Sequence, residues 1–224
     1  MSTLAVDTIT NATGASAVTI DSSGNLTTSG DVTIPTGHKI VGADSASIYA
    51  PGMQVQITQS DKVGSSNLVV NTSAYGNNKA NYVHLGSTYN LTVTTKLANS
   101  WIVVDGRIGL ANTNSSHGYF DMKVFTNGSD GGTAQWLSEL TAPGATGNAL
   151  PDGLIANHME SYAQNHIESF KVIYQPNVPA GTVLRFDPHV AAWSGGNVYI
   201  NKHASAGNYN QISFTRFMAT EIAQ

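Results

Sequence analysis

Three segments of the sequence carry apolar residues at both odd and even positions, so an extended strand there would be hydrophobic on both faces. They are residues 101–108, 170–174 and 212–218, the last reading ISFTRFM. A strand of this kind needs cover on both sides. For the last segment, with Phe214 and Phe217 on opposite faces, we predict a core on one side and a partner subunit on the other.

The other apolar residues after position 50 mostly alternate with polar ones, as in half-buried strands. The alternation runs through residues 53–57, 91–93, 120–124, 184–186 and 198–200. Turns rich in Gly, Asn and Pro separate roughly eight to ten such strands, a number typical of a sandwich or jelly roll. Helical periodicity is confined to a short stretch at 133–140. We predict an all-β fold, with a jelly-roll β-sandwich head over residues 51–224.

Residues 1–50 contain isolated apolar triplets among turn formers. Val18-Thr19-Ile20 returns as Val32-Thr33-Ile34 with Leu26 between them. Strands this short bury too little apolar surface to fold alone, but copies of the chain can cover one another. The spacing therefore predicts an intertwined β stalk of three chains with these side chains inward, and a disordered Ser/Thr/Gly-rich tail is the alternative. The predicted trimer interface comprises Val18, Ile20, Leu26, Val32, Ile34, Ile212, Phe214 and Phe217.

Composition limits the partners of the chain. Gly, Asn, Ser and Thr make up 87 of the 224 residues, while only 11% are charged and the net charge is −4. The ten basic residues are scattered, which argues against nucleic acid as a partner. No apolar run reaches the roughly 18 residues that span a bilayer, and we expect neither a secretory signal nor membrane insertion. The absence of cysteine excludes disulfides and thiolate metal sites.

Four stretches resemble fibre or other virion structural proteins of tailed bacteriophages. They are STLAVDTITNATG, VTIDSSGNLTTSGDVTIPTG, PGMQVQITQ and ISFTRFMATEIAQ, which cover both ends of the chain and the junction near residue 50. The resemblance implies a homotrimer whose N-terminal segment attaches to the virion and whose head is similar to the jelly rolls of tumour necrosis factor and C1q. It also implies that the last strand lies near the three-fold axis.

On this basis we expect a tail fibre that is assembled in the host cytoplasm and released by lysis. Residues 1–50 would attach to other virion proteins, and the head would bind a glycan or protein of the host surface. Two alternatives remain open. One is a capsid-decorating head fibre or tail adaptor that contacts only virion proteins, and the other is a polysaccharide depolymerase.

Aromatic residues in Gly/Asn-rich segments are the candidates for receptor contact, because a ring covers sugar C–H groups while nearby amides bind hydroxyls. The predicted contacts are Tyr75, Tyr82, Trp136, Trp193 and Tyr209. The alternative is that these rings pack loops or the subunit interface.

Evidence for metal binding or catalysis in the sequence is weak. His158 and Glu160, like His166 and Glu168, would share one face of an extended strand, a pairing that suits zinc but more commonly forms a solvated strand edge. His189, Ser194 and Asp187 lie close in sequence, which does not assemble a catalytic triad. Depolymerase chemistry would need two facing carboxylates among Asp121, Asp130, Glu139, Asp152, Glu160 and Glu168. We expect no cofactor and no enzymatic activity.

Overall fold

The computed structural model describes residues 8–10, 16–20, 22, 26–29, 51–60, 68–75, 78–112, 117–127, 134–141, 153–158, 166–201 and 215–224. The chain forms two compact units, Met1–Ile48 and Tyr49–Gln224. The change of sequence texture used to predict a stalk and a head lies close by, between residues 50 and 51. The tasks assigned to the two segments stay predictions.

The first unit contains a three-stranded antiparallel sheet in the order β1-β2-β3. Its strands are β1 (Thr8–Thr10), β2 (Ser16–Ile20) and β3 (Leu26–Thr28). Two of the predicted stalk side chains are described here: Val18 is half-buried, and Ile20 is exposed. Leu26 begins β3, whereas Val32 and Ile34 lie outside the described residues.

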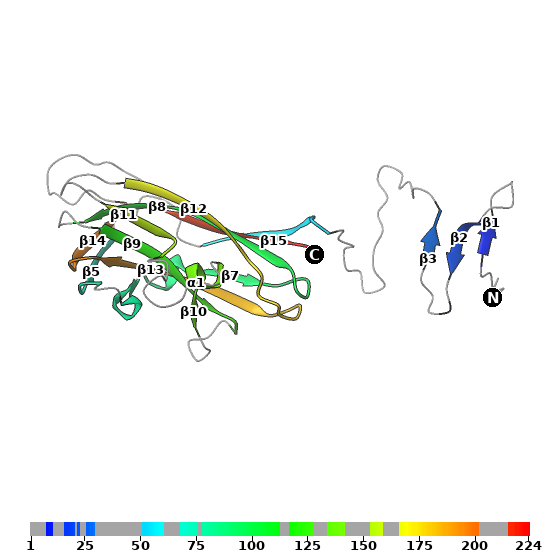
Figure 1. The fold of residues 1–224 in the computed structure, drawn as a ribbon, viewed down its shortest axis with the longest axis horizontal. Coiled ribbons are helices and arrows are strands. Elements are labelled where there is room, and N and C mark those ends of the chain that lie inside the picture. Colours follow the sequence, from blue (N-terminus) through cyan, green and yellow to red (C-terminus); the bar gives the residue numbers. More distant parts are fainter. Residues whose placement is uncertain are drawn as a thin grey trace. The chain divides into compact units, whose positions relative to one another are not determined.

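The second unit is a sandwich of two six-stranded antiparallel sheets (Figure 1). We name each sheet after one of its strands. The β15 sheet contains β4 (Gln54–Gln59), β5 (Leu68–Thr72), β8 (Trp101–Asn112), β12 (His166–Tyr174), β14 (Gly196–Ile200) and β15 (Arg216–Ile222). The β13 sheet contains β6 (Val83–His84), β7 (Leu91–Thr94), β9 (His117–Phe125), β10 (Gln135–Trp136), β11 (Ile155–His158) and β13 (Val183–Ala192). The all-β sandwich predicted for the head is therefore confirmed.

Short helical turns connect several strands of the β13 sheet. They are η1 (Lys79–Asn81), η2 (Ser87–Tyr89) and α1 (Leu137–Thr141). The helix predicted within residues 133–140 is confirmed as α1, although its first residues instead form β10. The side chain of Asn78 caps η1 by accepting a hydrogen bond from the backbone N–H of Ala80.

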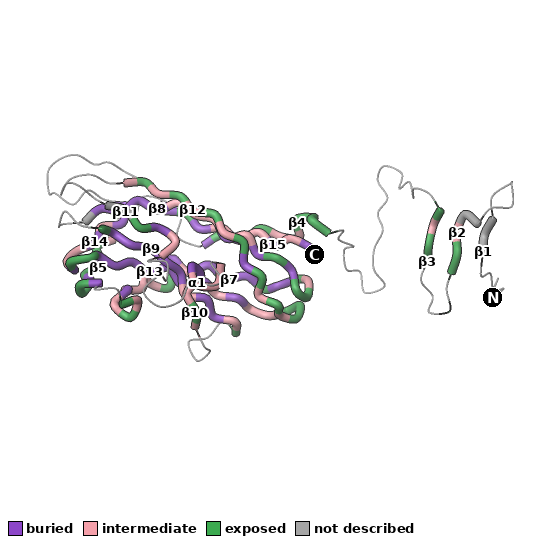
Figure 2. The backbone as a smooth tube through the Cα atoms, in the orientation of Figure 1, coloured by how far each residue is buried: buried purple, intermediate pink, exposed green. Residues whose placement is uncertain are grey.

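The hydrophobic core lies between the two sheets, and Figure 2 shows buried residues along the strands of both. Burial of this apolar surface is the main favourable term in folding. The largest side chains buried completely are Phe120, Phe186, Phe217, Leu91, Ile102, Ile108, Leu110, Met122, Leu137, Leu184 and Ile200.

A glycine in the middle of β8 lets three phenylalanine rings meet in this core. A Cβ atom on Gly106 would lie 2.6 Å from Cδ1 of Phe217 on β15 and 2.8 Å from Cε1 of Phe170 on β12. Phe120 of the opposite sheet stacks on Phe217, with ring centroids 5.4 Å apart and planes 15° apart. The bare backbone of Gly106 is therefore part of the packing that joins the sheets.

A buried carboxylate holds one end of the sandwich together. Glu221 on β15 is fully buried, and its oxygens accept hydrogen bonds from the backbone N–H groups of Lys96 and Leu97, from the Ser100 hydroxyl and from the Gln56 side chain. Residues 95–100 connect β7 of one sheet to β8 of the other. The Glu221 carboxylate thus links this connection to β15. Removing it would be costly, because several buried donors would lose their acceptor.

The two ends of the sandwich can be told apart by the strand register. At the end that we call proximal, the N–H of Gly52 donates to the carbonyl of Ala223, and Trp101 pairs with Ile222. At the opposite, distal end, β9 begins at His117 and β13 ends at Ala192. The chain therefore enters this unit and ends at the same proximal edge.

We predict that Gly106→Ala destabilises the second unit without changing its fold. The added methyl group would overlap the Phe217 and Phe170 rings, and overpacking of this kind costs about 1–3 kcal/mol. Urea denaturation followed by tryptophan fluorescence measures the free energy of unfolding. In the same background, Phe170→Leu should recover part of the loss, and a Gly106→Ala protein as stable as the parent would show that the rings are not packed on this glycine.

Candidate functional site

The outer face of the β15 sheet carries a row of side chains that crosses four strands. Thr220 on β15 pairs with Ile57 on β4 and with Val103 on β8, and Val103 pairs in turn with Ile173 on β12. Ile57 is 55% exposed and Ile173 is 58% exposed, although both lie in regular strands. The row is therefore an apolar stripe left open to solvent in one chain.

Other large apolar side chains lie on the same outer face of the sheet. Trp101 and Ile222 pair beside it at the proximal end, and Ile167 of β12 lies on the same face further along. Five of the eight exposed large hydrophobic residues in the described part of the chain belong to this outer face: Ile57, Val69, Trp101, Ile167 and Ile173. We define the apolar face as the outward side chains of Ile57, Trp101, Val103, Ile167, Ile173 and Ile222.

The sequence predicted a last strand that is apolar on both faces and that places Phe217 at the subunit interface, but the structure places this side chain differently. Phe217 is fully buried in the core of a single chain, so it is not available for a contact with a second chain. The outward side chains of β15 are those of Arg216, Met218, Thr220 and Ile222. Ile212 and Phe214 lie outside the described residues.

The outer face of the β13 sheet is different, because aromatic rings form a continuous series of contacts across it. We call this series the aromatic seam: His117, Trp193, Tyr75, Tyr82, Trp136, His189 and His84, in that order. Successive ring centroids lie 5.1 to 6.4 Å apart. Ring pairs at such distances add to the stability gained from burial alone.

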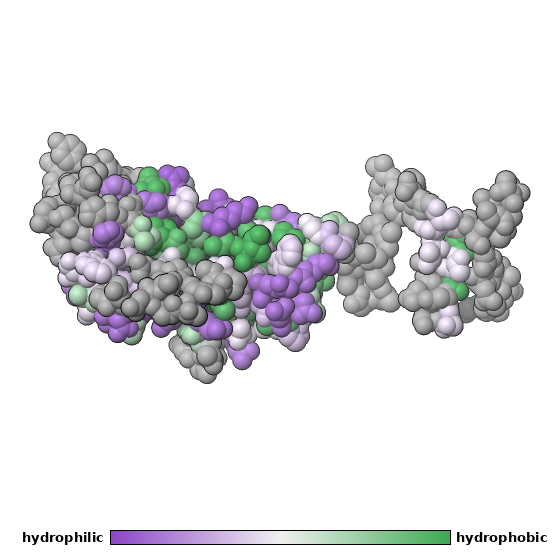
Figure 3. All heavy atoms as spheres, viewed as in Figure 1, coloured by the Kyte–Doolittle hydropathy of each residue, from purple (hydrophilic) through white to green (hydrophobic). Residues whose placement is uncertain are grey.

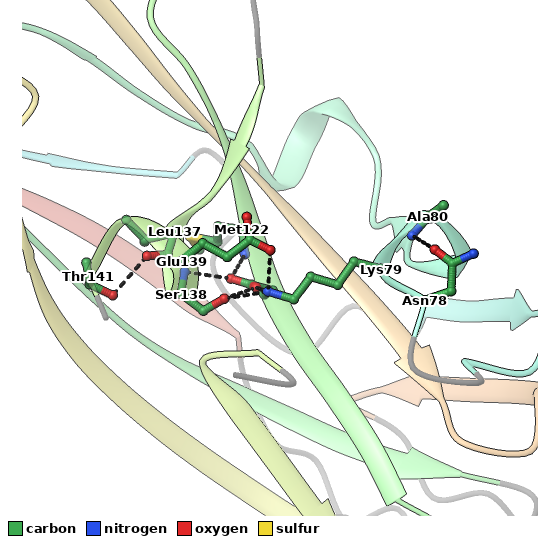
Figure 4. Close-up of polar contacts among 9 residues, drawn as sticks. Asn78, Lys79, Ala80, Met122, Leu137, Ser138, Glu139 and Thr141 are labelled. Atoms are coloured by element: carbon green, nitrogen blue, oxygen red, sulfur yellow. Dashed lines mark hydrogen bonds and ion pairs between the residues drawn. The ribbon is translucent and has the colours of Figure 1, made fainter. Parts of the chain in front are cut away.

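An ion pair fastens η1 and α1 over the middle of this face. The ammonium group of Lys79 lies 3.1 Å from the carboxylate of Asp121 on β9 and 3.2 Å from that of Glu139 on α1. It also donates to the Ser138 hydroxyl, and Figure 4 shows Lys79 reaching toward Ser138 and Glu139. Because Asp121 is fully buried, its charge depends on Lys79 and on these hydrogen bonds for compensation.

Burial and charge act in opposite directions on Asp121. Burial, the larger effect, raises the pKa of this carboxyl group, while Lys79, the Ser138 hydroxyl and the Met122 N–H lower it. Desolvation disfavours the charged form, whereas a cation and hydrogen-bond donors favour it. Among the groups that favour the charged form of Asp121, Lys79 therefore has the largest effect.

His189 lies next to this ion pair, opposite Asp121 in the strand register, and near one end of the seam. Its Nδ1–H donates to the backbone carbonyl of Asp187, and its ring stacks on His84 at a centroid distance of 5.1 Å. The pKa of His189 is lowered from 6.5 to about 4, mainly by burial; the hydrogen bond to the Asp187 carbonyl acts in the opposite direction, and the charges of His84 and Lys123 add to the lowering. The ring is thus a neutral packing element near pH 7.

Trp193 is the exposed part of the seam and lies at the distal end. It is 43% exposed, and its ring contacts those of Tyr75, Tyr119 and His117. Its backbone N–H donates to the carbonyl of His117, and its own carbonyl accepts from the N–H of Tyr75. Packing and hydrogen bonds therefore hold this indole in a defined position at the surface.

The aromatic candidates from the sequence fall into three groups. Trp193 is exposed and Trp136 is half-buried. Tyr75 and Tyr82 are buried inside the seam, where they pack a loop as the alternative interpretation proposed, so their rings are not presented at the surface. Tyr209 lies outside the described residues.

The metal and catalytic candidates do not form a recognisable centre. His166 and Glu168 share the inward-facing side of β12, but the His158 side chain and Glu160 lie outside the described residues. Within the described ranges, no group of three or more His, Asp or Glu residues lies close enough to hold a metal ion.

The carboxylates proposed for catalysis are engaged elsewhere. The carboxylate of Asp187 binds Arg185, at 2.7 Å from its Nε, and not the His189 ring. Asp121 and Glu139 do approach one another, but through the shared Lys79. Asp130 and Asp152 lie outside the described residues.

Sequence reasoning missed three groups that organise these faces. They are Glu221, the Lys79–Asp121 pair and the outward row through Val103 and Ile173. A charged residue in the middle of an apolar alternation, as at Asp121 and Glu221, was the available signal for the first two. The row required the register of four strands, and no local pattern contains it.

We predict that His189 makes the stability of the second unit fall as the pH is lowered from about 6.5 to about 4. In this window the unfolded chain binds a proton at this position and the folded chain does not, so acid favours unfolding, by up to about 3 kcal/mol. Urea denaturation at pH 7 and pH 4.5 measures the effect. His189→Gln should flatten this part of the pH profile, and an unchanged profile would contradict the assignment.

No helix in the described part of the chain has the length and apolar composition needed to cross a membrane.

No protein-family model matches the sequence, and no curated protein matches it. The fold is similar to that in the "Structure of infectious bursal disease virus Gt strain", with a TM-score of 0.39 and 11% identity over 93% of this chain and 47% of the viral one. This chain therefore spans about half the length of that viral chain.

A second similar structure is that of Eiger TNF from S. frugiperda, with a TM-score of 0.37 and 10% identity over 78% of this chain and 95% of the other. A third is the infectious bursal disease virus VP2 subviral particle, with a TM-score of 0.35 and 11% identity over 87% of this chain and 42% of the other. All three TM-scores lie below 0.5, so these likenesses carry no functional argument.

Proposed function

We propose that the protein is a virion structural protein, a homotrimeric phage fibre whose head binds a glycan or protein on the host surface. The observation that carries this proposal is the apolar face. Ile57 and Ile173 are exposed in one row across the sheet, with Thr220 and Val103 between them, and exposed Trp101 lies two residues from Val103. Exposed apolar surface of this kind is unfavourable for an isolated chain, and larger apolar patches mark interaction sites.

Copies of the same chain are the partners that would cover most of the exposed apolar surface. The first unit is a three-stranded sheet with Ile20 exposed, and sheets of this size need a covered apolar face for stability. Self-association covers both this sheet and the apolar face of the second unit in one assembly. Three copies is the number that the resemblance to phage fibre proteins implies.

The polarity of the second unit is compatible with attachment at one end and host contact at the other. The chain enters and ends at the proximal end, near Gly52 and Ala223. Trp193 lies at the distal end, fixed by its neighbours in the seam. In the proposed fibre, residues 1–50 bind the virion and the distal end meets the host. Weak contacts then act together through effective concentration.

We predict that the purified chain has three times the 23.5 kDa mass of one copy and that Ile173→Lys weakens the assembly. A lysine charge placed in an apolar interface loses hydration without gaining a partner, so dissociation should begin at a protein concentration at least about tenfold higher. Light scattering coupled to size exclusion measures the mass over a dilution series.

The matched control for this experiment is Trp193→Ser, which removes an exposed apolar side chain from the other sheet and should leave the mass unchanged. Because Ile173 is largely exposed in one chain, its substitution should have little effect on the fold of that chain. A parent protein with a mass of 23.5 kDa at micromolar concentration would overturn the trimer.

We also predict that Trp193→Ser reduces adsorption of the assembled protein to host cells, because a stacked indole in a binding site contributes about 1–3 kcal/mol. Sedimentation of fluorescently labelled protein with cells measures the bound fraction. Met53→Ser, which removes an exposed apolar side chain at the proximal end, serves as the control. No adsorption by the parent protein to any permissive host would favour the capsid-decorating or adaptor alternative.

A further inference from the structure

Lys79, Asp121, Ser138 and Glu139 form a compact polar cluster where η1 and α1 meet β9. The ammonium nitrogen Nζ of Lys79 lies 3.1 Å from Oδ2 of Asp121, 2.8 Å from the Ser138 hydroxyl and 3.2 Å from Oε1 of Glu139 (Figure 4). The Asp121 side chain is fully buried, and that of Lys79 is only 10% exposed. The cluster therefore holds an amine against a carboxyl group where water has little access.

The two oxygens of the Asp121 carboxyl group have different partners. Oδ1 accepts hydrogen bonds from the backbone N–H groups of Met122, at 2.8 Å, and Ser138, at 3.3 Å. Oδ2 accepts from the Ser138 hydroxyl and from Lys79. Paired N–H donors stabilise the negative charge that an oxygen gains when a nucleophile attacks its carbon. The surroundings of Asp121 thus suit attack at Cγ, with Oδ2 as the oxygen that leaves.

The cluster is also poorly hydrated. The ring centroid of Trp136 lies 5.6 Å from Nζ of Lys79, so the indole covers the ammonium group. Burial costs both partners of an ion pair their hydration, and burial raises the pKa of Asp121. A neutral amide between Lys79 and Asp121 would remove both buried charges. Fixed contact favours its formation, because well-oriented intramolecular groups react as if at about 10⁵ to 10⁸ M.

We propose that the side chains of Lys79 and Asp121 condense to an intramolecular isopeptide bond, with Ser138 and Glu139 transferring the protons. The bond would join η1 to β9 and so fix the loop between residues 79 and 121. All four residues belong to one chain, so the proposal does not depend on the fibre function.

The reaction releases one water and needs no oxidant or co-reactant. One proton passes from the Lys79 ammonium through the Ser138 hydroxyl to Oδ2, and the free amine attacks Cγ of Asp121. A second proton passes from the nitrogen to Glu139, which delivers it to Oδ2 as the Cγ–Oδ2 bond breaks and water leaves. The third proton stays on the amide nitrogen, and Glu139 ends as the carboxylate with which it began.

The test is the intact mass of the denatured full-length protein, which should lie about 18 Da below the sequence mass because one water is lost. In a trypsin digest, residues 63–96 should be joined to residues 108–123, because trypsin does not cleave after an acylated lysine. Water lost elsewhere in the chain would leave residues 63–79 as a separate peptide. That result, or a folded protein of full sequence mass, would overturn the proposal.

Lys79→Arg replaces the amine with a guanidinium that keeps the positive charge beside Asp121 but stays protonated and does not attack a carboxyl group. This protein should have its full sequence mass. Lys123→Arg is the matched control, because it makes the same exchange on the strand of Asp121 and its ammonium also contacts Trp136, at 4.9 Å. It should retain the mass deficit. The same deficit in the Lys79→Arg protein would exclude the Lys79–Asp121 bond.

Glu139→Gln tests the proton transfer while leaving the Lys79–Asp121 contact in place. The Glu139 side chain is 32% exposed, so this variant should fold. An amide does not take up the proton, so the cross-linked fraction at a fixed time after expression should fall at least about tenfold. Equal cross-linking in the Glu139→Gln and parent proteins would show that the role assigned to Glu139 is wrong.

Discussion

The contact of Phe217 and Phe170 with the backbone of Gly106 determines which side of β8 faces the core. Both rings occupy the space that a side chain at this position would need, and Phe120 of the other sheet packs against them. Because successive side chains of a strand point to opposite faces, the neighbours Asp105 and Arg107 must then face outward. The row of outward side chains is therefore a consequence of packing on the inner face.

The two outer faces of the sandwich are covered in different ways. On the β13 sheet, η1 and α1 lie over the strands, held by Lys79 and by the aromatic seam, so the chain itself supplies the cover. On the β15 sheet, Ile57 and Ile173 stay open to solvent. This asymmetry is why we assign assembly to one face and host contact to the distal end of the other.

Local sequence patterns predicted the strands better than the surfaces. Alternation identified the regions of β4, β7, β9, β13 and β14, and consecutive apolar residues marked β8 as two-faced. The patterns could not say which face is inward, so Phe217 was assigned to a subunit contact although it fills the core. Tyr75 and Tyr82 were expected at the surface because Gly/Asn-rich loops usually lie there, but residues distant in the sequence bury them.

The sequence by itself determined the β-rich class, the short connections and the need for cover on two-faced strands, because these follow from side-chain period and turn chemistry. Only the tertiary structure decided which residues share a surface. Thr220, Val103 and Ile173 form a row through pairings between strands far apart in the chain. A shift of one residue in those pairings would send every such side chain to the opposite face.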